Sequence, residues 1–308
     1  MSALPFAGRR SGLATLAFAV ILAGRVTVWA GSDSTWVFLR FERQVPLDTL
    51  DAVAVAVDPL GRVYLADRRS DKIYRLNAEL RVDADVGGYG WKREQFDLPV
   101  DLCAKNGLDV YVCDYNNHRV ERYDKDLHYL ASLPGRDLPA PWRFGFPASV
   151  AQSSHGDLFV ADRENVRIVR FDALGQPRLA FGNIESGAGQ LTDPVRVDVI
   201  GTEQVVVLDS TDRRVVVFDF FGNYMTSFGE QVLQRPVGLA CTPDGLLLVA
   251  DQRAGIVAFT NGQRLPVAIL PSRSLSPFDL DVRGDRLYVL DRREPSLILY
   301  RVEFRRRE

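Results

Sequence analysis

The sequence predicts an all-β fold made of repeated units, because one short pattern occurs six times. Each copy is a β-rich run that ends in aspartate, followed by a polar loop of four residues and a second β-rich run. The successive aspartates are 47, 48, 47, 42 and 40 residues apart; they are Asp67, Asp114, Asp162, Asp209, Asp251 and Asp291. This period fits radial repetition of four-stranded sheets and is longer than most solenoid repeats. We therefore expect a six-bladed β-propeller of four-stranded antiparallel blades.

Each repeat is expected to contain four strands. An inner strand starts near a proline in five copies, and a tight turn, rich in glycine, leads into the second strand, which ends at the repeated aspartate. The third strand follows the polar loop, and a more polar fourth strand follows the next turn. The expected blades are residues 52–86, 99–133, 147–182, 194–228, 236–270 and 277–303, the last completed by residues 35–42.

The sixth repeat ends after its third strand, so its outer edge would lie open to pairing with other chains. The segment 36–41, Trp-Val-Phe-Leu-Arg-Phe, has the length and alternation of the missing strand. We expect this N-terminal strand to close the ring, so that residues 34–308 form one domain.

The first thirty residues are expected to be an export signal. Arg9 and Arg10 precede an apolar stretch of eleven residues, Leu13 to Ala23, and small residues around Ala30 suit cleavage. Because a bilayer requires roughly twenty apolar residues, no stable membrane span is expected, and a retained anchor is the alternative. The expected location is periplasmic or extracellular.

Composition narrows the partner classes. The net charge of −2 gives no general attraction to nucleic acid or to an anionic membrane, so no nucleic-acid partner is expected. The three cysteines rule out a disulfide framework, and each occupies a position that small apolar residues fill in other repeats. A bridge between Cys103 and Cys113 is the alternative.

Two segments resemble the NHL repeat. One is residues 181–194 with residues 207–215, and the other is residues 114–120, which contain an Asn-His-Arg core. The resemblance extends from Ala52 onward and implies a six-bladed propeller. It implies no single function, because the family includes interaction domains, sensor domains, RNA binders and a metal-dependent lyase.

The repeated aspartates are predicted to have a structural role. In four copies a cation follows five residues later, as Arg119 follows Asp114. Such a carboxylate can accept loop N–H bonds and pair with the cation, whereas six equivalent catalytic carboxylates have no chemical use. Asp251 and Asp291 lack the cation, so it is optional.

The polar loops carry many arginines and are expected to share one face of the disc with the segments that enter each inner strand. Arginine suits carboxylate, phosphate or acidic-glycan recognition. Trp142 lies in an approach segment and is expected to be exposed, where tryptophan favours protein contact. The candidate ligand contacts on this face are Asn116, Arg119, Trp142 and Arg163. The alternative is that these loops are simply polar.

A second candidate site follows from the position two residues after each inner-strand proline. Around the ring this position reads Ala54, Asp101, Ser149, Arg196, Gly238 and Asp279. Asp101, Arg196 and Asp279 should therefore point toward the channel mouth, with Arg196 reaching across to the carboxylates. The alternatives are a ligand site that includes Ser149 and a structural ion cluster. Asp101 and Asp279, with Asp198 and Asp281 further down the strands, are candidate ligands for a divalent cation such as calcium.

The sequence favours an exported, non-catalytic binding module that presents its mildly basic loop face to a protein or an anionic ligand. No catalytic residue is assigned and no cofactor is expected beyond the possible cation. The alternative is a metal-assisted hydrolase or lyase, lactonase-like or amidating-lyase-like, at the channel mouth. A metal site built from histidines is not expected. The three histidines, His118, His128 and His155, fall on different parts of the repeat and should not converge.

Overall fold

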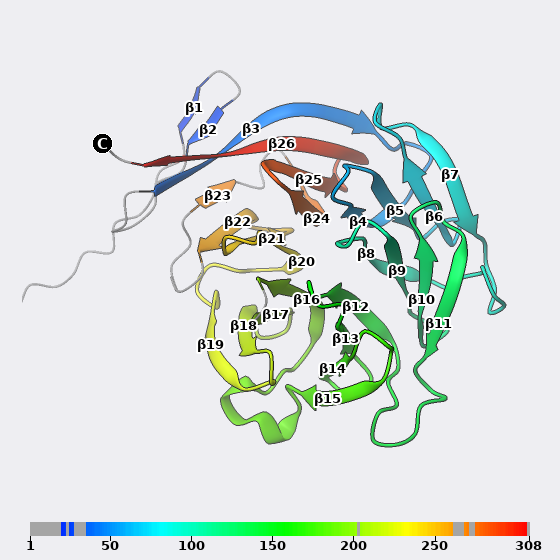
Figure 1. Ribbon diagram of the computed structural model, residues 1–308. Helices are drawn as coiled ribbons and strands as arrows, with labels where there is room; N and C mark the ends of the chain where they lie inside the picture. Colours follow the sequence, from blue (N-terminus) through cyan, green and yellow to red (C-terminus); the bar gives the residue numbers. More distant parts are fainter. Residues whose placement is uncertain are drawn as a thin grey trace, which may run out of the picture.

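The computed structural model describes residues 20–22, 25–27, 35–201, 204–260, 268–270 and 275–306. These residues form six antiparallel sheets arranged in a ring, which confirms the predicted six-bladed propeller (Figure 1). In blades one to five the chain runs outward from an inner strand at the centre to an outer strand at the edge.

The strands of the first three blades correspond to the predicted repeats. Blade one contains β4 (Ala52–Val57), β5 (Val63–Asp67), β6 (Lys72–Leu76) and β7 (Val82–Gly87). Blade two contains β8 (Pro99–Cys103), β9 (Asp109–Asp114), β10 (Arg119–Asp124) and β11 (Tyr129–Pro134). Blade three contains β12 (Pro147–Gln152), β13 (Leu158–Asp162), β14 (Arg167–Phe171) and β15 (Pro177–Phe181).

The remaining blades follow the same order. A 3₁₀ turn, η1 (Ile184–Gly189), precedes blade four, which contains β16 (Pro194–Ile200), β17 (Gln204–Asp209), β18 (Arg214–Asp219) and β19 (Tyr224–Phe228). Blade five contains β20 (Pro236–Cys241), β21 (Leu246–Asp251), β22 (Gly255–Thr260) and β23 (Ala268–Leu270). Blade six contains β24 (Pro277–Arg283), β25 (Arg286–Asp291), β26 (Ser296–Arg306) and the N-terminal β3 (Thr35–Pro46).

The ring closes through β3, as predicted. This strand pairs antiparallel with β26 along its full length, from Ser296 opposite Pro46 to Arg306 opposite Thr35. The rings of Phe41 and Tyr300 meet edge to face across the pair, with centroids 6.2 Å apart. Figure 1 shows the two long strands side by side at the rim of the disc. The closing strand is twice as long as the expected segment 36–41, because β26 itself continues to Arg306.

Two short strands extend the sixth sheet beyond β3. They are β1 (Val20–Leu22) and β2 (Arg25–Thr27), which pair with each other, and β2 pairs with β3. The other residues of the segment 1–30, expected to be an export signal, lie outside the described residues. The described part of the chain contains no helix with the length and hydropathy that crossing a membrane requires.

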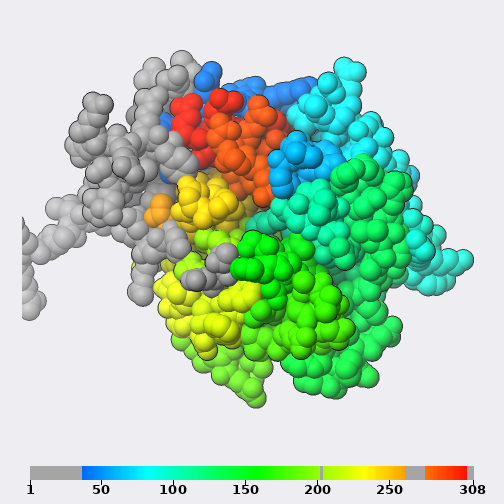
Figure 2. All heavy atoms as spheres, viewed as in Figure 1, coloured from blue at the N-terminus to red at the C-terminus, as the bar shows by residue number. Residues whose placement is uncertain are grey.

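The hydrophobic core is divided among the blade interfaces. Six buried clusters each combine side chains from two adjacent blades, and one of them joins blade six to blade one. The space-filling view shows the blades as sectors that pack directly against one another (Figure 2). The three cysteines are free and buried in these interfaces, so no bridge joins Cys103 to Cys113.

Candidate functional site

Each inner strand carries a β-bulge at the same place, directly after its first residue. There the pairing with the second strand shifts by one, so the second residue of each inner strand has no partner in the ladder. Bulges re-aim side chains and are common next to functional sites. The bulged residues, Val53, Val100, Ala148, Val195, Val237 and Phe278, all line one cavity.

This cavity lies on the face that carries the loops after the repeated aspartates, and we call it the loop-face funnel. Its volume is about 760 Å³. Arg196 lies at its inner end, the bulged apolar residues form a ring above, and polar side chains form its outer wall. The wall residues include Arg68, Tyr115, Arg163, Asp193, Thr211, Arg213, Gln234 and Arg235.

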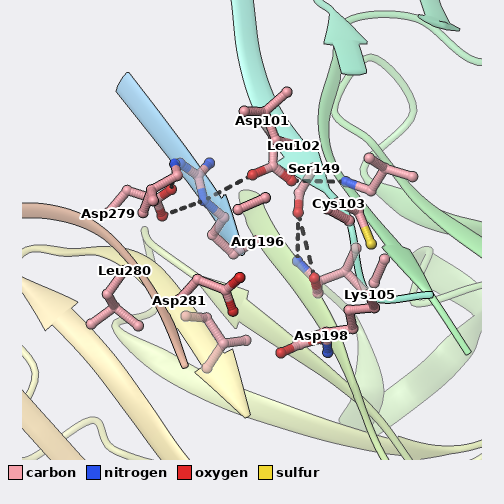
Figure 3. Close-up of a pocket in the computed structure, with 17 residues that line it drawn as sticks. Asp101, Leu102, Cys103, Lys105, Ser149, Arg196, Asp198, Asp279, Leu280 and Asp281 are labelled. Carbon is pink, nitrogen blue, oxygen red and sulfur yellow. Dashed lines mark hydrogen bonds and ion pairs between the residues drawn. The ribbon is translucent and has the colours of Figure 1, made fainter. Parts of the chain in front are cut away.

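The residue after each bulge is the predicted channel position, and the structure brings three of these side chains together. Nε of Arg196 lies 3.3 Å from Oδ1 of Asp279 and 3.7 Å from Oδ1 of Asp101. All three residues are buried, at 9%, 3% and 6% exposure respectively. Figure 3 shows the guanidinium of Arg196 between the two carboxylates. The spacing between repeats thus predicts this cluster correctly.

The same polar residues join neighbouring blades. Oδ2 of Asp101 accepts a hydrogen bond of 2.9 Å from the backbone N–H of Val150, and Oδ2 of Asp279 accepts one of 2.9 Å from Val55. Ser149 accepts a 3.0 Å bond from the N–H of Val197 through its hydroxyl oxygen. Since an inner strand has no strand neighbour on its channel side, its N–H groups need such acceptors. The polar ring therefore has a structural role, whatever else it does.

Burial raises the pKa of Asp279 to about 7, against the opposing effect of Arg196. Burial also raises the pKa of Asp101, while Arg196 again acts in the opposite direction. A single guanidinium is thus shared between two buried carboxylates.

A second ionic layer lies deeper in the channel. Lys105 forms an ion pair with Asp198, and Oδ2 of Asp281 accepts a 2.7 Å bond from the N–H of Val57. Both layers line an inner chamber of about 40 Å³, enough for no more than a few water molecules. The polar layers therefore make the channel narrow at its centre.

The opposite face carries a separate cavity of about 710 Å³, lined in part by Lys105, Ser154, His155 and Arg283. His155 is thus remote from the loop-face funnel.

The other two histidines lie elsewhere. His128 contacts Asp124 just before the fourth strand of blade two. His118 accepts a 3.0 Å bond from the N–H of Phe146. Within the described residues, no group of three or more His, Cys, Asp or Glu side chains is arranged to hold a metal ion. The cation assigned to Asp101 and Asp279 stays a prediction.

The repeated aspartates brace the loops, as their contacts show. All six carboxylates are buried, at 0% to 5% exposure. Asp251, for example, accepts N–H bonds from Arg235 at 2.9 Å, before its blade, and from Ala254 at 2.8 Å, after its own strand. Asp67, Asp114, Asp162, Asp209 and Asp291 likewise accept backbone bonds from the segments that enter their blades.

The cation five residues later has a more varied role than predicted. Nε of Arg119 lies 2.8 Å from Asp114, and its other nitrogens donate to the carbonyl oxygens of Trp91, Lys92 and Gln95. Arg167 likewise donates hydrogen bonds to the carboxylate of Asp162 and to the carbonyl oxygens of Pro141 and Arg143.

In the other two blades the cation pairs elsewhere. Lys72 pairs with Asp85 at 2.6 Å, and Arg214 pairs with Asp212 at 3.1 Å. The reason is local, because each of these cations has another carboxylate within reach.

The four loop-face candidates lie in different surroundings. Arg163 lines the loop-face funnel and pairs with Asp193 through two bonds of 2.7 and 3.1 Å. Arg119 is occupied by the bracing contacts, and Asn116 donates a 2.8 Å bond to Asp97. The expected exposure of Trp142 is wrong, because its side chain is half-buried against the core between blades two and three.

Sequence reasoning missed the apolar ring and Arg235, and it placed Arg213 on the basic loop face without singling it out. The ring is visible in the repeats as the second residue of each inner strand, which follows a proline in five copies and is never charged. Arg213 is one of many loop arginines, and Arg235 precedes a proline. Their proximity to the funnel depends on loop geometry that the repeat pattern does not specify.

Comparison with known proteins agrees with the fold. The NHL repeat family matches residues 96–123 and 144–171. The chain is 30% identical to the protein brain tumor of Drosophila melanogaster over 111 residues, which cover 35% of this chain and 11% of that protein. It is 36% identical to the human E3 ubiquitin-protein ligase NHLRC1 over 89 residues, 29% of this chain and 22% of that protein. The chain thus spans only a small part of these curated relatives.

Among solved structures, virginiamycin B lyase from Staphylococcus aureus has a similar fold. The TM-score is 0.61 at 13% identity, and the alignment covers 92% of this chain and 93% of that one. At this identity the likeness concerns the fold alone. The six blades and the central channel define a closed β-propeller. With the matched segments, they show a β-propeller whose second and third blades match the NHL repeat family.

Proposed function

We propose that this propeller is an exported, non-catalytic binding module whose loop-face funnel holds an anionic group of a partner protein. A protein partner accords with the frequent role of NHL propellers in protein binding. Export is supported by the arginine pair and the short apolar stretch near the N-terminus.

The observation that carries the proposal is the charge of the funnel. Among the described residues, five arginines line it, Arg68, Arg163, Arg196, Arg213 and Arg235, against one acidic residue, Asp193. Guanidinium groups bind carboxylates and phosphates through paired, directional hydrogen bonds. A concave site of this volume with a few convergent polar groups is the usual form of a binding pocket.

The geometry of the buried cluster favours binding over catalysis. Both oxygens of Asp101 and of Asp279 are engaged, one by Arg196 and the other by a backbone N–H. Carboxylates used in this way hold the inner strands in place. They support the floor of the funnel, and Arg196 is the member of the cluster that lines it.

Affinity capture tests this proposal. The full chain is immobilised and exposed to an extract of the source cells, alongside an Arg213→Ala/Arg235→Ala double variant. An Arg81→Ala/Arg178→Ala double variant removes the same charge from positions that do not line the funnel. We expect the wild type and the control to capture the same protein and the funnel variant to lose it. Equal capture by all three chains would refute the role of the funnel.

Export has its own measurement. N-terminal sequencing of the protein recovered from the cell envelope or the medium should start near Gly31. Recovery of the protein only from the cytoplasm, with its first thirty residues intact, would contradict export.

A further inference from the structure

The unpaired positive charge of the funnel lies on one side. Arg68 forms two bonds to Asp51, of 3.1 and 2.7 Å, and Arg163 forms two bonds to Asp193. In contrast, the side chains of Arg213 and Arg235 make no hydrogen bond or ion pair within the described part of the chain. An incoming anion therefore meets free guanidinium groups at blade four and at the entry to blade five.

A third arginine, Arg292, lies next to the funnel and lines a neighbouring cavity. The guanidinium of Arg292 stacks on the ring of Phe278, with Cζ 3.4 Å from the ring centroid. Its Nε and one of its terminal nitrogens have no hydrogen-bond partner among the residues that the structure describes. Burial lowers the pKa of Arg292, and the nearby Arg68 and Arg235 add to this effect. An anion at this position would relieve repulsion among the arginines.

The apolar ring adds a second requirement. The bulged residues present an uncharged surface beneath the free arginines, and Leu98 adds to it. Val100, Val195, Val237 and Phe278 are partly exposed there, whereas Val53 and Ala148 are buried. Covering such a surface is favourable in proportion to the apolar area removed from water. A small inorganic anion would satisfy the arginines and leave this ring hydrated. A ligand that uses the whole funnel therefore has an anionic part and an apolar part.

From these two observations, and resting on the proposed function, we propose that the funnel binds an acidic linear peptide segment. An apolar side chain of the segment enters the ring, and its carboxylates contact Arg213 and Arg235. Thr211 and Gln234, which line the same side, supply uncharged hydrogen-bonding groups for the peptide backbone.

A nucleic acid fits these observations less well. Binding along a phosphate backbone requires cations that follow an extended track. Here the free cations, Arg213 and Arg235, gather at one side of the funnel, and the net charge of the chain is −2. The observations therefore favour the peptide, and an RNA oligomer serves as a rival in the test.

The test uses fluorescence anisotropy with the full chain and a labelled peptide, Glu-Asp-Phe-Glu-Asp. Companion peptides replace Phe with Ser or the acidic residues with Lys. We expect only the acidic peptide with Phe to bind well. Arg213→Ala and Arg235→Ala should each weaken binding about tenfold, the loss typical of one charge-assisted hydrogen bond. Val237→Ser should weaken binding of the Phe peptide more than that of the Ser peptide, and Arg178→Ala should change nothing.

Three results would overturn the peptide assignment. The first is equal binding of the Phe and Ser peptides, and the second is unchanged affinity in both arginine variants. The third is displacement of the labelled peptide by an RNA oligomer or inorganic phosphate at a lower concentration than unlabelled peptide requires. If the peptides fail while capture of a partner still depends on Arg213 and Arg235, the peptide assignment is wrong and the proposed function stands. If capture is also unaffected by these variants, both are wrong.

Discussion

Replacement of Arg196 with methionine tests the ion cluster at the centre of the propeller. The variant keeps a side chain of similar length and removes the guanidinium that lies 3.3 Å from Asp279 and 3.7 Å from Asp101. Both carboxylates would remain buried without this countercharge. Breaking a buried ion pair on one side costs about 3–5 kcal/mol. We therefore expect the free energy of unfolding at pH 8 to fall by about that amount.

The cost should depend on pH. The pKa of Asp279 is already raised to about 7 in the folded protein, against a value near 4 in an unfolded chain. The folded state thus binds a proton that the unfolded state has released, so this group favours folding most at low pH and loses that contribution as pH rises through 7. Without Arg196 the carboxylates should bind protons more tightly still. The destabilisation should therefore be smaller at pH 5 than at pH 8.

Urea unfolding followed by tryptophan fluorescence at pH 5 and pH 8 measures both effects. Asp114 and Glu121 also have a raised pKa, about 6 and about 7, through burial. Comparison of variant and wild type at the same pH largely removes their contribution. Adding Asp279→Asn to the Arg196→Met variant should restore part of the stability at pH 8. A loss below about 1 kcal/mol at both pH values would refute the buried cluster, because that is the range of exposed pairs.

Two further predictions concern the loops and the cysteines. Arg119→Ala should accelerate amide hydrogen exchange in residues 88–96 and lower the free energy of unfolding by about 2–4 kcal/mol. The reason is that the carbonyl oxygens of this connection lose charge-assisted hydrogen bonds. Unchanged exchange rates in residues 88–96 would contradict the bracing role. The cysteines should not react with a thiol reagent at pH 8 until urea unfolds the chain. Burial raises the pKa of the Cys103 thiol to about 11, and it raises the pKa values of Cys113 and Cys241 well above that of a free thiol. Rapid reaction of the native protein would show that the blade interfaces are open.

The repeat pattern predicts the ring and its closure well. A blade cannot bury its faces alone, so each copy of the pattern implies neighbours, and a sixth copy without an outer strand implies a donor elsewhere. Asp101, Arg196 and Asp279 could be placed together for the same reason. Equivalent positions of different blades must lie around one axis, and Arg196 is the only cation among them.

The surface of the funnel could not be predicted in the same way. Whether an arginine is free depends on which carboxylate its loop meets, as the contrast between Arg163, paired with Asp193, and Arg213 shows. The sequence predicts an exposed Trp142 because this residue lies in an approach segment, but that segment packs against the core between blades two and three. Such contacts depend on loop conformations that differ from blade to blade.

Site-directed photocrosslinking tests the central claim most directly. A benzophenone amino acid is placed at Thr211, which lines the loop-face funnel, or at Ser154, which lines the cavity on the opposite face. Irradiation in the presence of the acidic Phe peptide, or of the captured partner, should give a crosslinked product from Thr211 and none from Ser154. Crosslinking from Ser154 alone would contradict the account, because it would place the ligand on the other face of the disc.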